Sequence, residues 1–199
     1  MASSAIKPMV NKFIEPIARG LLAIGVTPNA ITLAGAFGSS VSAAYFFTQG
    51  HLMVGVTAVS IFTLSDLLDG TMARVSAHGA TRWGGFIDSV ADRFTDSAIM
   101  GGIIMYLVKA GDSLSYVAIS SLVVGFLIPY IRAKAESIGI ACTVGNAERT
   151  ERLILALTAI GLEGLGVDYA LAIGLWVLFV LSVITVGQRV FVVYKGLKN

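Results

Sequence analysis

The sequence predicts an all-α integral membrane protein with six transmembrane helices and an N-terminal amphipathic helix on the membrane surface. Of the 199 residues, 56% are hydrophobic and 13% are charged, whereas about a quarter of the residues of a soluble domain are charged. The mean hydropathy is +0.83. The hydrophobic residues form six stretches joined by connecting segments. We therefore expect residues 1–199 to form a single membrane domain.

Residues 1–25 have a helical periodicity with one basic face. Lys7, Lys12 and Arg19 lie among apolar residues that recur at helical spacing. A helix of this kind lies in the plane of the membrane interface. Thr27 followed by a proline is typical of the start of a new helix, so the surface helix is expected to end just before it.

Six hydrophobic stretches follow, and about 20 apolar residues suffice for a helix to cross the hydrocarbon core. They lie near residues 30–48, 52–75, 84–109, 114–135, 150–164 and 168–193. With six spans, nearly all basic residues fall on one side and Lys109 falls on the other. The positive-inside rule then places both termini and the polar loops at 76–83 and 136–149 in the cytoplasm. This predicts a multi-pass protein of the cell membrane.

Four carboxylates lie in the second and third stretches. Asp66 and Asp69 are three residues apart, and Asp88 and Asp92 are four apart, so each pair shares one face of a helix. Each acidic residue at the centre of a membrane helix costs about 2.5–3.5 kcal/mol. If the two helices are antiparallel, all four carboxylates can converge on a hard divalent cation, Mg²⁺ or Mn²⁺. The site then lies near the cytoplasmic ends of its helices.

Small residues lie between the two aspartate pairs. Gly70, Ala73 and Gly84 lack bulk, so a ligand or a neighbouring backbone can approach closely. Arg74 follows Asp69 by slightly more than one helical turn. From that position its guanidinium can hold a phosphate that the metal also contacts.

The pattern Asp-x2-Asp-Gly-x2-Ala-Arg-x9-Gly-x3-Asp-x3-Asp resembles the signature of the CDP-alcohol phosphotransferases. Its fixed positions are Asp66, Asp69, Gly70, Ala73, Arg74, Gly84, Asp88 and Asp92. The resemblance implies that Asp66, Asp69 and Asp88 bind two divalent ions, Mg²⁺ or Mn²⁺. It makes Asp92 the general base, and a further ligand role for Asp92 stays open.

A second segment of that family, Pro-Asn-x2-Thr, is present as Pro28, Asn29 and Thr32. The residues alone are explained equally well by helix capping and by hydrogen bonds to a nucleotide. The resemblance favours cytidine. It implies that CDP-diacylglycerol contacts a set formed by Asn29, Thr32, Gly70, Ala73 and Arg74.

Five basic residues mark the ends of the last three stretches: Arg132, Lys134, Arg149, Arg152 and Arg189. They are either a basic collar that touches anionic lipid or a pocket for a phosphate on the acceptor. Together with Arg-Ala-Lys-Ala-Glu-Ser they are similar to the bacterial phosphatidylinositol-phosphate synthases. This resemblance implies inositol phosphate as the acceptor. Phosphatidylglycerol-phosphate synthase is the alternative, since glycerol phosphate also carries a phosphate.

Other expectations concern the partners and a different class of protein. The resemblance implies a homodimer in membrane lipid, with no nucleic-acid partner. A cation-coupled transporter is the alternative class, because paired carboxylates also occur in ion pathways. Asp96 lies outside the signature, and we interpret it as a structural partner, for example to Arg93.

Overall fold

The computed structural model of the protein describes residues 14–76, 79–145 and 148–198. Within these ranges every regular element is a helix and none is a strand, which confirms the all-α prediction. Lys7 and Lys12, on the predicted basic face of the surface helix, lie outside the described residues. Residues 14–23 are helical, and an ion pair of 2.7 Å joins Glu15 to Arg19 on this helix.

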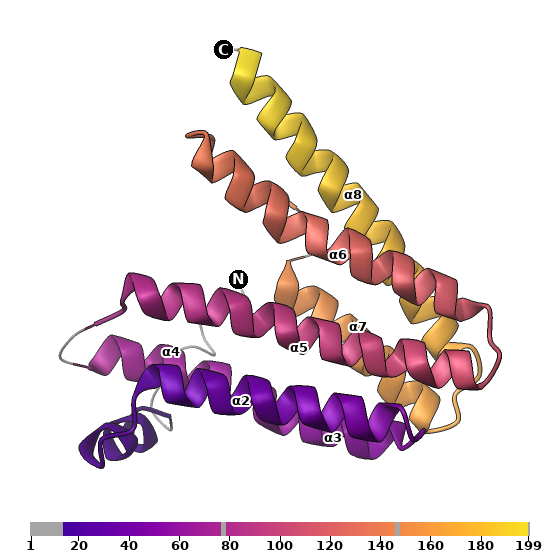
Figure 1. Ribbon diagram of the computed structural model, residues 1–199, viewed down its shortest axis with the longest axis horizontal. Helices are drawn as coiled ribbons and strands as arrows, with labels where there is room; N and C mark the ends of the chain where they lie inside the picture. The colour runs from indigo at the N-terminus through magenta and orange to yellow at the C-terminus, as the bar shows by residue number, and fades with distance from the viewer. Residues whose placement is uncertain (1–13, 77–78, 146–147, 199) are drawn as a thin grey trace. The chain divides into compact units, whose positions relative to one another are not determined.

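The helices follow the predicted stretches closely (Figure 1). They are α2 (Pro28–Ser42), the π-helical η1 (Ala43–Phe47), α3 (Leu52–Thr63), α4 (Ser65–Val75), α5 (Arg82–Lys109), α6 (Leu114–Ser137), α7 (Arg149–Gly164) and α8 (Ala170–Lys198). The predicted start of the first span is confirmed, because the Thr27 hydroxyl accepts a hydrogen bond from the Ala30 N–H at 3.2 Å. Two stretches are less regular than expected. The first ends in the π-helical turn, and the second is divided at Leu64.

Four of the described helical segments are long and apolar enough to cross a membrane: Pro28–Phe47, Leu52–Val75, Leu114–Ser137 and Ala170–Lys198. The protein is therefore a multi-pass membrane protein. The α5 helix is 28 residues long, but three aspartates and two arginines lie in its first 15 residues. The α7 helix has only 16 residues, fewer than the roughly 20 that span the hydrocarbon core upright. Six spans therefore stay a prediction.

The chain divides into two compact units. The first unit comprises Met1–Ala43 and Thr57–Ala98, and in it α2 packs against α4. Glycines allow the close approach of α2: a Cβ placed at Gly35 would overlap the Ser65 side chain, and one at Gly38 would overlap the ring of Phe62. Small residues at a helix contact are the usual device for packing within a membrane.

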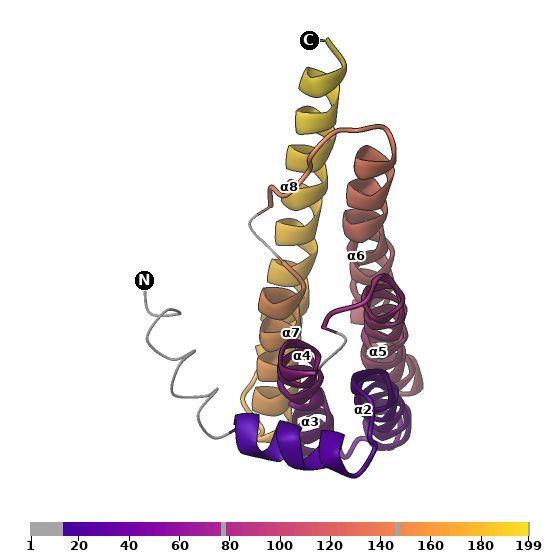
Figure 2. The same cartoon turned by 90° about the vertical axis from the view of Figure 1, so that its left-hand side faces the viewer.

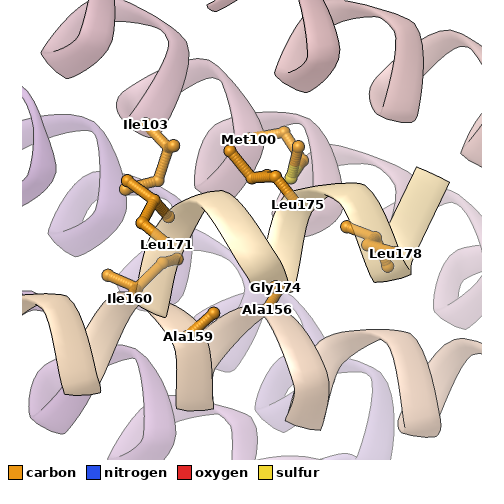
Figure 3. Close-up of a pocket in the computed structure, with 9 residues that line it drawn as sticks. All are labelled: Met100, Ile103, Ala156, Ala159, Ile160, Leu171, Gly174, Leu175 and Leu178. Atoms are coloured by element: carbon orange, nitrogen blue, oxygen red, sulfur yellow. The ribbon is translucent and has the colours of Figure 1, made fainter. Parts of the chain in front are cut away.

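The second unit comprises Ala44–Val56 and Ile99–Asn199. In it α8 packs against both α6 and α7 (Figures 1 and 2). Figure 3 shows the apolar contact of α8 with α7 and the second half of α5, where Leu171 and Leu175 face Ile160 and Met100 around a cavity of about 10 Å³. Such a cavity is barely large enough for one water molecule. The packing of this region is therefore close to complete.

The contact between Gly174 and Ala159 generates a prediction for stability. A Cβ at Gly174 would lie 2.2 Å from the Ala159 Cβ, whereas one at Gly187, on the same helix, meets nothing within 4 Å. Overpacking a core costs about 1–3 kcal/mol, while Gly→Ala in an open helix position gains up to about 1 kcal/mol. We expect Gly174→Ala to lower the thermal midpoint in detergent and Gly187→Ala to leave it unchanged or raise it. Equal midpoints for the two variants would contradict the packing described.

Candidate active site

Both aspartate pairs lie in the first unit, on the two helices predicted to carry them. Asp66 and Asp69 are on α4, and Asp88 and Asp92 are on α5. Asp69 is buried, with 8% of its surface exposed. Asp66 and Asp92 are half-buried and Asp88 is exposed. The four carboxylates therefore differ in environment, and Asp69 is the one most removed from solvent.

Asp69 accepts a hydrogen bond of 2.5 Å from the hydroxyl of Thr32. Thr32 is itself buried in the first turns of α2, where its hydroxyl also lies 3.2 Å from the Pro28 carbonyl. A hydrogen bond to a charged group is worth about 1.5–3 kcal/mol. This contact joins the Pro-Asn-x2-Thr segment to the aspartate motif. Sequence reasoning missed it, because the two residues are 37 positions apart and no local pattern links them.

The start of α2 also lies against the start of α5. A Cβ at Gly84 would be 3.1 Å from Asn29 Oδ1 and 3.2 Å from Thr81 Oγ1. The Gly84 N–H donates to that threonine hydroxyl at 2.9 Å. The glycine of the motif thus leaves room for the Asn29 side chain. Through Asn29 and Thr32, the first turns of α2 contact both helices that carry the aspartates.

The donor set of the four aspartates suits a hard divalent cation. The charges of both Asp66 and Asp88 act on the Asp69 carboxyl group, and like charges around a buried carboxylate favour a bound cation. In the described part of the chain, no group of three His, Cys, Asp or Glu residues is close enough together to hold a metal ion. The convergence of all four aspartates therefore stays a prediction. Carboxylate oxygens are the ligands that Mg²⁺ and Mn²⁺ prefer.

Arg74 lies over the small residues of α4. Its Nη2 donates to Thr71 Oγ1 at 2.9 Å, and a Cβ at Gly70 would be 3.7 Å from Nη1. The side chain is exposed, so a bound phosphate can still reach its remaining donors. Ala73 is half-buried beside it.

Arg93 contacts two carboxylates on α5. Its Nε lies 3.7 Å from Asp96 Oδ2 and its Nη2 lies 3.5 Å from Asp92 Oδ2. The predicted pairing of Asp96 with Arg93 is confirmed. The contact with Asp92 was not predicted, although the two residues are adjacent in the sequence. Arg93 therefore places a positive charge beside the predicted base.

The basic residues predicted to bind an acceptor phosphate lie in the second unit. Lys134 is exposed and lines a groove of about 150 Å³ between α6 and α8, together with Tyr130, Val190 and Val193. Arg132 is engaged with Glu136 at 2.9 Å. Two members of the set, Arg149 and Arg152, lie in the first turn of α7 and are half-buried.

Arg189 has a different environment from the other four. It is 5% exposed. Its Nη1 donates to the Ile128 carbonyl at 2.7 Å, and its Nε donates to the Val144 carbonyl at 2.9 Å. These two partners were not predicted, because backbone carbonyls leave no signal in a sequence. Whether Arg189 also binds a phosphate stays a prediction.

Comparison with known proteins gives a family match over most of the chain. Residues 25–192 match the sequence model of the CDP-alcohol phosphatidyltransferase family. A phosphatidylinositol phosphate synthase of Streptomyces avermitilis is 38% identical over 95% of this chain and 84% of its own length. One of Cutibacterium acnes is 39% identical over 94% of this chain and 95% of its own length.

Solved structures agree in fold as well as in sequence. The crystal structure of Mycobacterium tuberculosis phosphatidylinositol phosphate synthase with CDP-DAG bound has a TM-score of 0.88 and 38% identity, covering 92% of this chain and 94% of that one. The same enzyme in complex with manganese and citrate gives a TM-score of 0.85, covering 91% of this chain and 88% of that one. With the family match across both units and these relatives over nearly their full length, the chain belongs to the CDP-alcohol phosphatidyltransferase family of enzymes.

Proposed function

We propose that this enzyme transfers a phosphatidyl group from CDP-diacylglycerol to inositol phosphate, giving phosphatidylinositol phosphate and CMP. The observation that carries the proposal is the hydrogen bond from Thr32 to Asp69. It joins the Pro-Asn-x2-Thr segment, which the family resemblance assigns to the nucleotide, to the aspartate motif within one unit. The names of the Streptomyces, Cutibacterium and Mycobacterium relatives support inositol phosphate as the acceptor.

In this proposal Asn29, Thr32, Gly70, Ala73 and Arg74 hold CDP-diacylglycerol. Two divalent ions, Mg²⁺ or Mn²⁺, are held by Asp66, Asp69, Asp88 and Asp92. The manganese complex of the M. tuberculosis relative supports a divalent metal. When bound, such ions neutralise the phosphate oxygens and the leaving group.

The transfer then needs an acceptor hydroxyl in line with the β-phosphorus and a base for its proton. Asp92 takes that proton as the hydroxyl oxygen bonds to the β-phosphorus, and the bond from that phosphorus to the bridging oxygen breaks to release CMP. Arg93 places a positive charge beside Asp92, since its Nη2 lies 3.5 Å from Asp92 Oδ2. Arg74 holds a phosphate oxygen of the donor.

The phosphate of the acceptor is bound by basic side chains of the second unit. The proposed set is Lys134, Arg152, Arg189, Arg132 and Arg149. A phosphate accepts charge-assisted hydrogen bonds, which are roughly twice as strong as neutral ones. Lys134 and Arg152 are the members chosen to test the assignment, because they come from two different helices, α6 and α7.

We further propose that residues 1–199 act as one domain with six spans, in which α5 and α7 cross the membrane with the four apolar segments. The basic residues then face the cytoplasm of the cell, where the site opens to water-soluble acceptors. The enzyme acts as a homodimer in the plasma membrane.

Release of CMP against a panel of acceptors tests the function. Purified protein is supplied with CDP-diacylglycerol, a divalent cation and, in separate reactions, inositol phosphate, glycerol phosphate, inositol or serine. We expect no CMP release with inositol or serine, because only a phosphorylated acceptor uses the basic set, and we expect inositol phosphate to be preferred to glycerol phosphate, as the names of the relatives indicate. Preference for glycerol phosphate would instead assign the enzyme as a phosphatidylglycerol-phosphate synthase. Ion flux in sealed vesicles without CMP release would indicate a transporter.

Substitution of the aspartates tests the metal site. We expect Asp66→Asn, Asp69→Asn and Asp88→Asn to abolish turnover and to weaken Mn²⁺ binding, because each removes a charged ligand. Asp92→Asn should abolish turnover while CDP-diacylglycerol binding is largely retained. Asp168→Asn, in an exposed loop position, is the matched control and should stay active. Full activity of Asp69→Asn in the presence of a chelator would end the metal hypothesis.

Acceptor kinetics test the basic set. Loss of one hydrogen bond to a charged group costs about 1.5–3 kcal/mol, which is roughly a ten- to hundredfold change in affinity. We expect Lys134→Gln and Arg152→Gln to raise the KM for inositol phosphate by this factor in neutral detergent, with CDP-diacylglycerol binding unchanged. Lys198→Gln, exposed at the end of α8, is the control. Unchanged acceptor kinetics in both variants would leave only a basic collar for lipid.

A further inference from the structure

The connection from α6 to α7 begins at a fixed turn. Three backbone N–H groups, of residues 138, 139 and 140, donate to carbonyls in the last turn of α6 at 2.9–3.1 Å. Gly139 has a φ of 80°, as is usual for the glycine that ends a helix. Residues 140–145 then have no regular secondary structure. We call residues 138–145 the strap.

The strap lies along α8 in the opposite chain direction (Figure 2). A Cβ at Gly196 would be 3.1 Å from the Ile140 side chain. The Cys142 thiol lies 3.9 Å from the Arg189 carbonyl. A Cβ at Gly145, whose φ is 145°, would be 2.6 Å from Thr185 Cγ2. The strap is therefore seated on α8 from Gly196 to Thr185.

One side chain fastens the strap to both neighbouring helices. The Arg189 guanidinium donates through Nε to the Val144 carbonyl of the strap and through Nη1 to the Ile128 carbonyl of α6. A buried guanidinium needs such acceptors, because an unsatisfied buried charge is costly. Arg189 thus joins α6, α8 and the strap.

The strap leads directly to the first turn of α7. Glu148 caps that helix, and its N–H donates to the Glu151 carboxylate at 2.7 Å in a capping box. Only two residues separate Gly145 from Glu148 in the sequence. The seat of the strap on α8 therefore restricts where α7, with Arg149 and Arg152, can begin.

We propose that Arg189, in addition to its place in the basic set, clamps the strap on α8 through Nε and Nη1 and thereby positions Arg149 and Arg152 for the acceptor. The consequence for the acceptor rests on the proposed function, whereas the clamp itself does not. A clamp differs from a phosphate ligand in its chemical requirement. It needs two donors aimed at two separate carbonyls, which the arginine fork supplies and a lysine ammonium does not.

The reactivity of Cys142 reports directly on the strap. Cys142 is the only cysteine in the chain and its exposed fraction is 0%, so a thiol reagent reaches it only when the strap lifts. Loss of a hydrogen bond to a charged group makes such local opening roughly ten- to hundredfold more frequent. We expect maleimide labelling of purified protein in detergent to accelerate by that factor in Arg189→Gln and equally in Arg189→Lys.

Gly145 provides a test that touches no basic side chain. Gly145→Ala should accelerate labelling and raise the KM for inositol phosphate about tenfold with kcat little changed, because its Cβ collides with Thr185 Cγ2. Adding Thr185→Ser removes that methyl group, keeps the hydroxyl that donates to the Leu181 carbonyl, and should restore part of both values. The part of the effect that Thr185→Ser does not restore reflects the positive φ of Gly145, which alanine adopts only with strain. Thr185→Ser alone and Gly187→Ala, an open position on α8, are the controls.

Several results would overturn the clamp. One is that Cys142 is labelled as slowly in Arg189→Gln and Gly145→Ala as in the wild-type protein. Another is that the KM for inositol phosphate is normal in Arg189→Lys but raised in Arg189→Gln, since a positive charge alone would then account for the role of Arg189. Fast labelling of Gly145→Ala with an unchanged acceptor KM would overturn the link to α7. If the wild-type protein does not use inositol phosphate at all, the proposed function fails, and the labelling rates still decide on the clamp.

Discussion

The carboxyl group of Asp69 is the constraint around which the first unit is arranged. It is buried in a predominantly apolar chain, where an ionised group must be compensated by nearby partners. The Thr32 hydroxyl supplies one hydrogen bond. For Thr32 to reach it, α2 must lie close to α4, which Gly35 permits because a Cβ there would overlap Ser65. The same approach brings Asn29 against the start of α5.

In the second unit a buried cation has the corresponding role. Arg189 is held by two carbonyl oxygens from segments that are 16 residues apart in the chain, Ile128 and Val144. Neither partner is charged. Carbonyl groups satisfy the donors without adding a second buried charge that would have to be desolvated. Among the described residues, each unit therefore buries one charged side chain, Asp69 or Arg189, and hydrogen bonds join other segments to it.

Local features of this fold were predictable from the sequence, and features that depend on distant segments were not. The hydrophobic stretches predicted the helical segments from α2 to α8, and the Thr27–Pro28 pair predicted the start of α2. Both signals lie in consecutive residues. The spacing of Arg93 and Asp96 gave their ion pair for the same reason. The contacts of Thr32 with Asp69 and of Arg189 with Val144 depend on tertiary packing. The interruptions at η1 and Leu64 also lack a sequence signal such as proline.

The charge distribution along α5 has a consequence for how the protein enters the membrane during synthesis. Only the last roughly 12 residues before Lys109 are free of charge, and a helix of that length covers about 18 Å of a hydrocarbon core about 30 Å thick. The translocon would therefore meet α5 as a poorly inserting segment. The polar surface that can accompany its aspartates belongs to α2 and α4, which leave the ribosome earlier. Insertion of α5 is thus expected to depend on helices that are already in the bilayer. Because α2 and α4 precede α5 in the sequence, they are available when α5 is inserted.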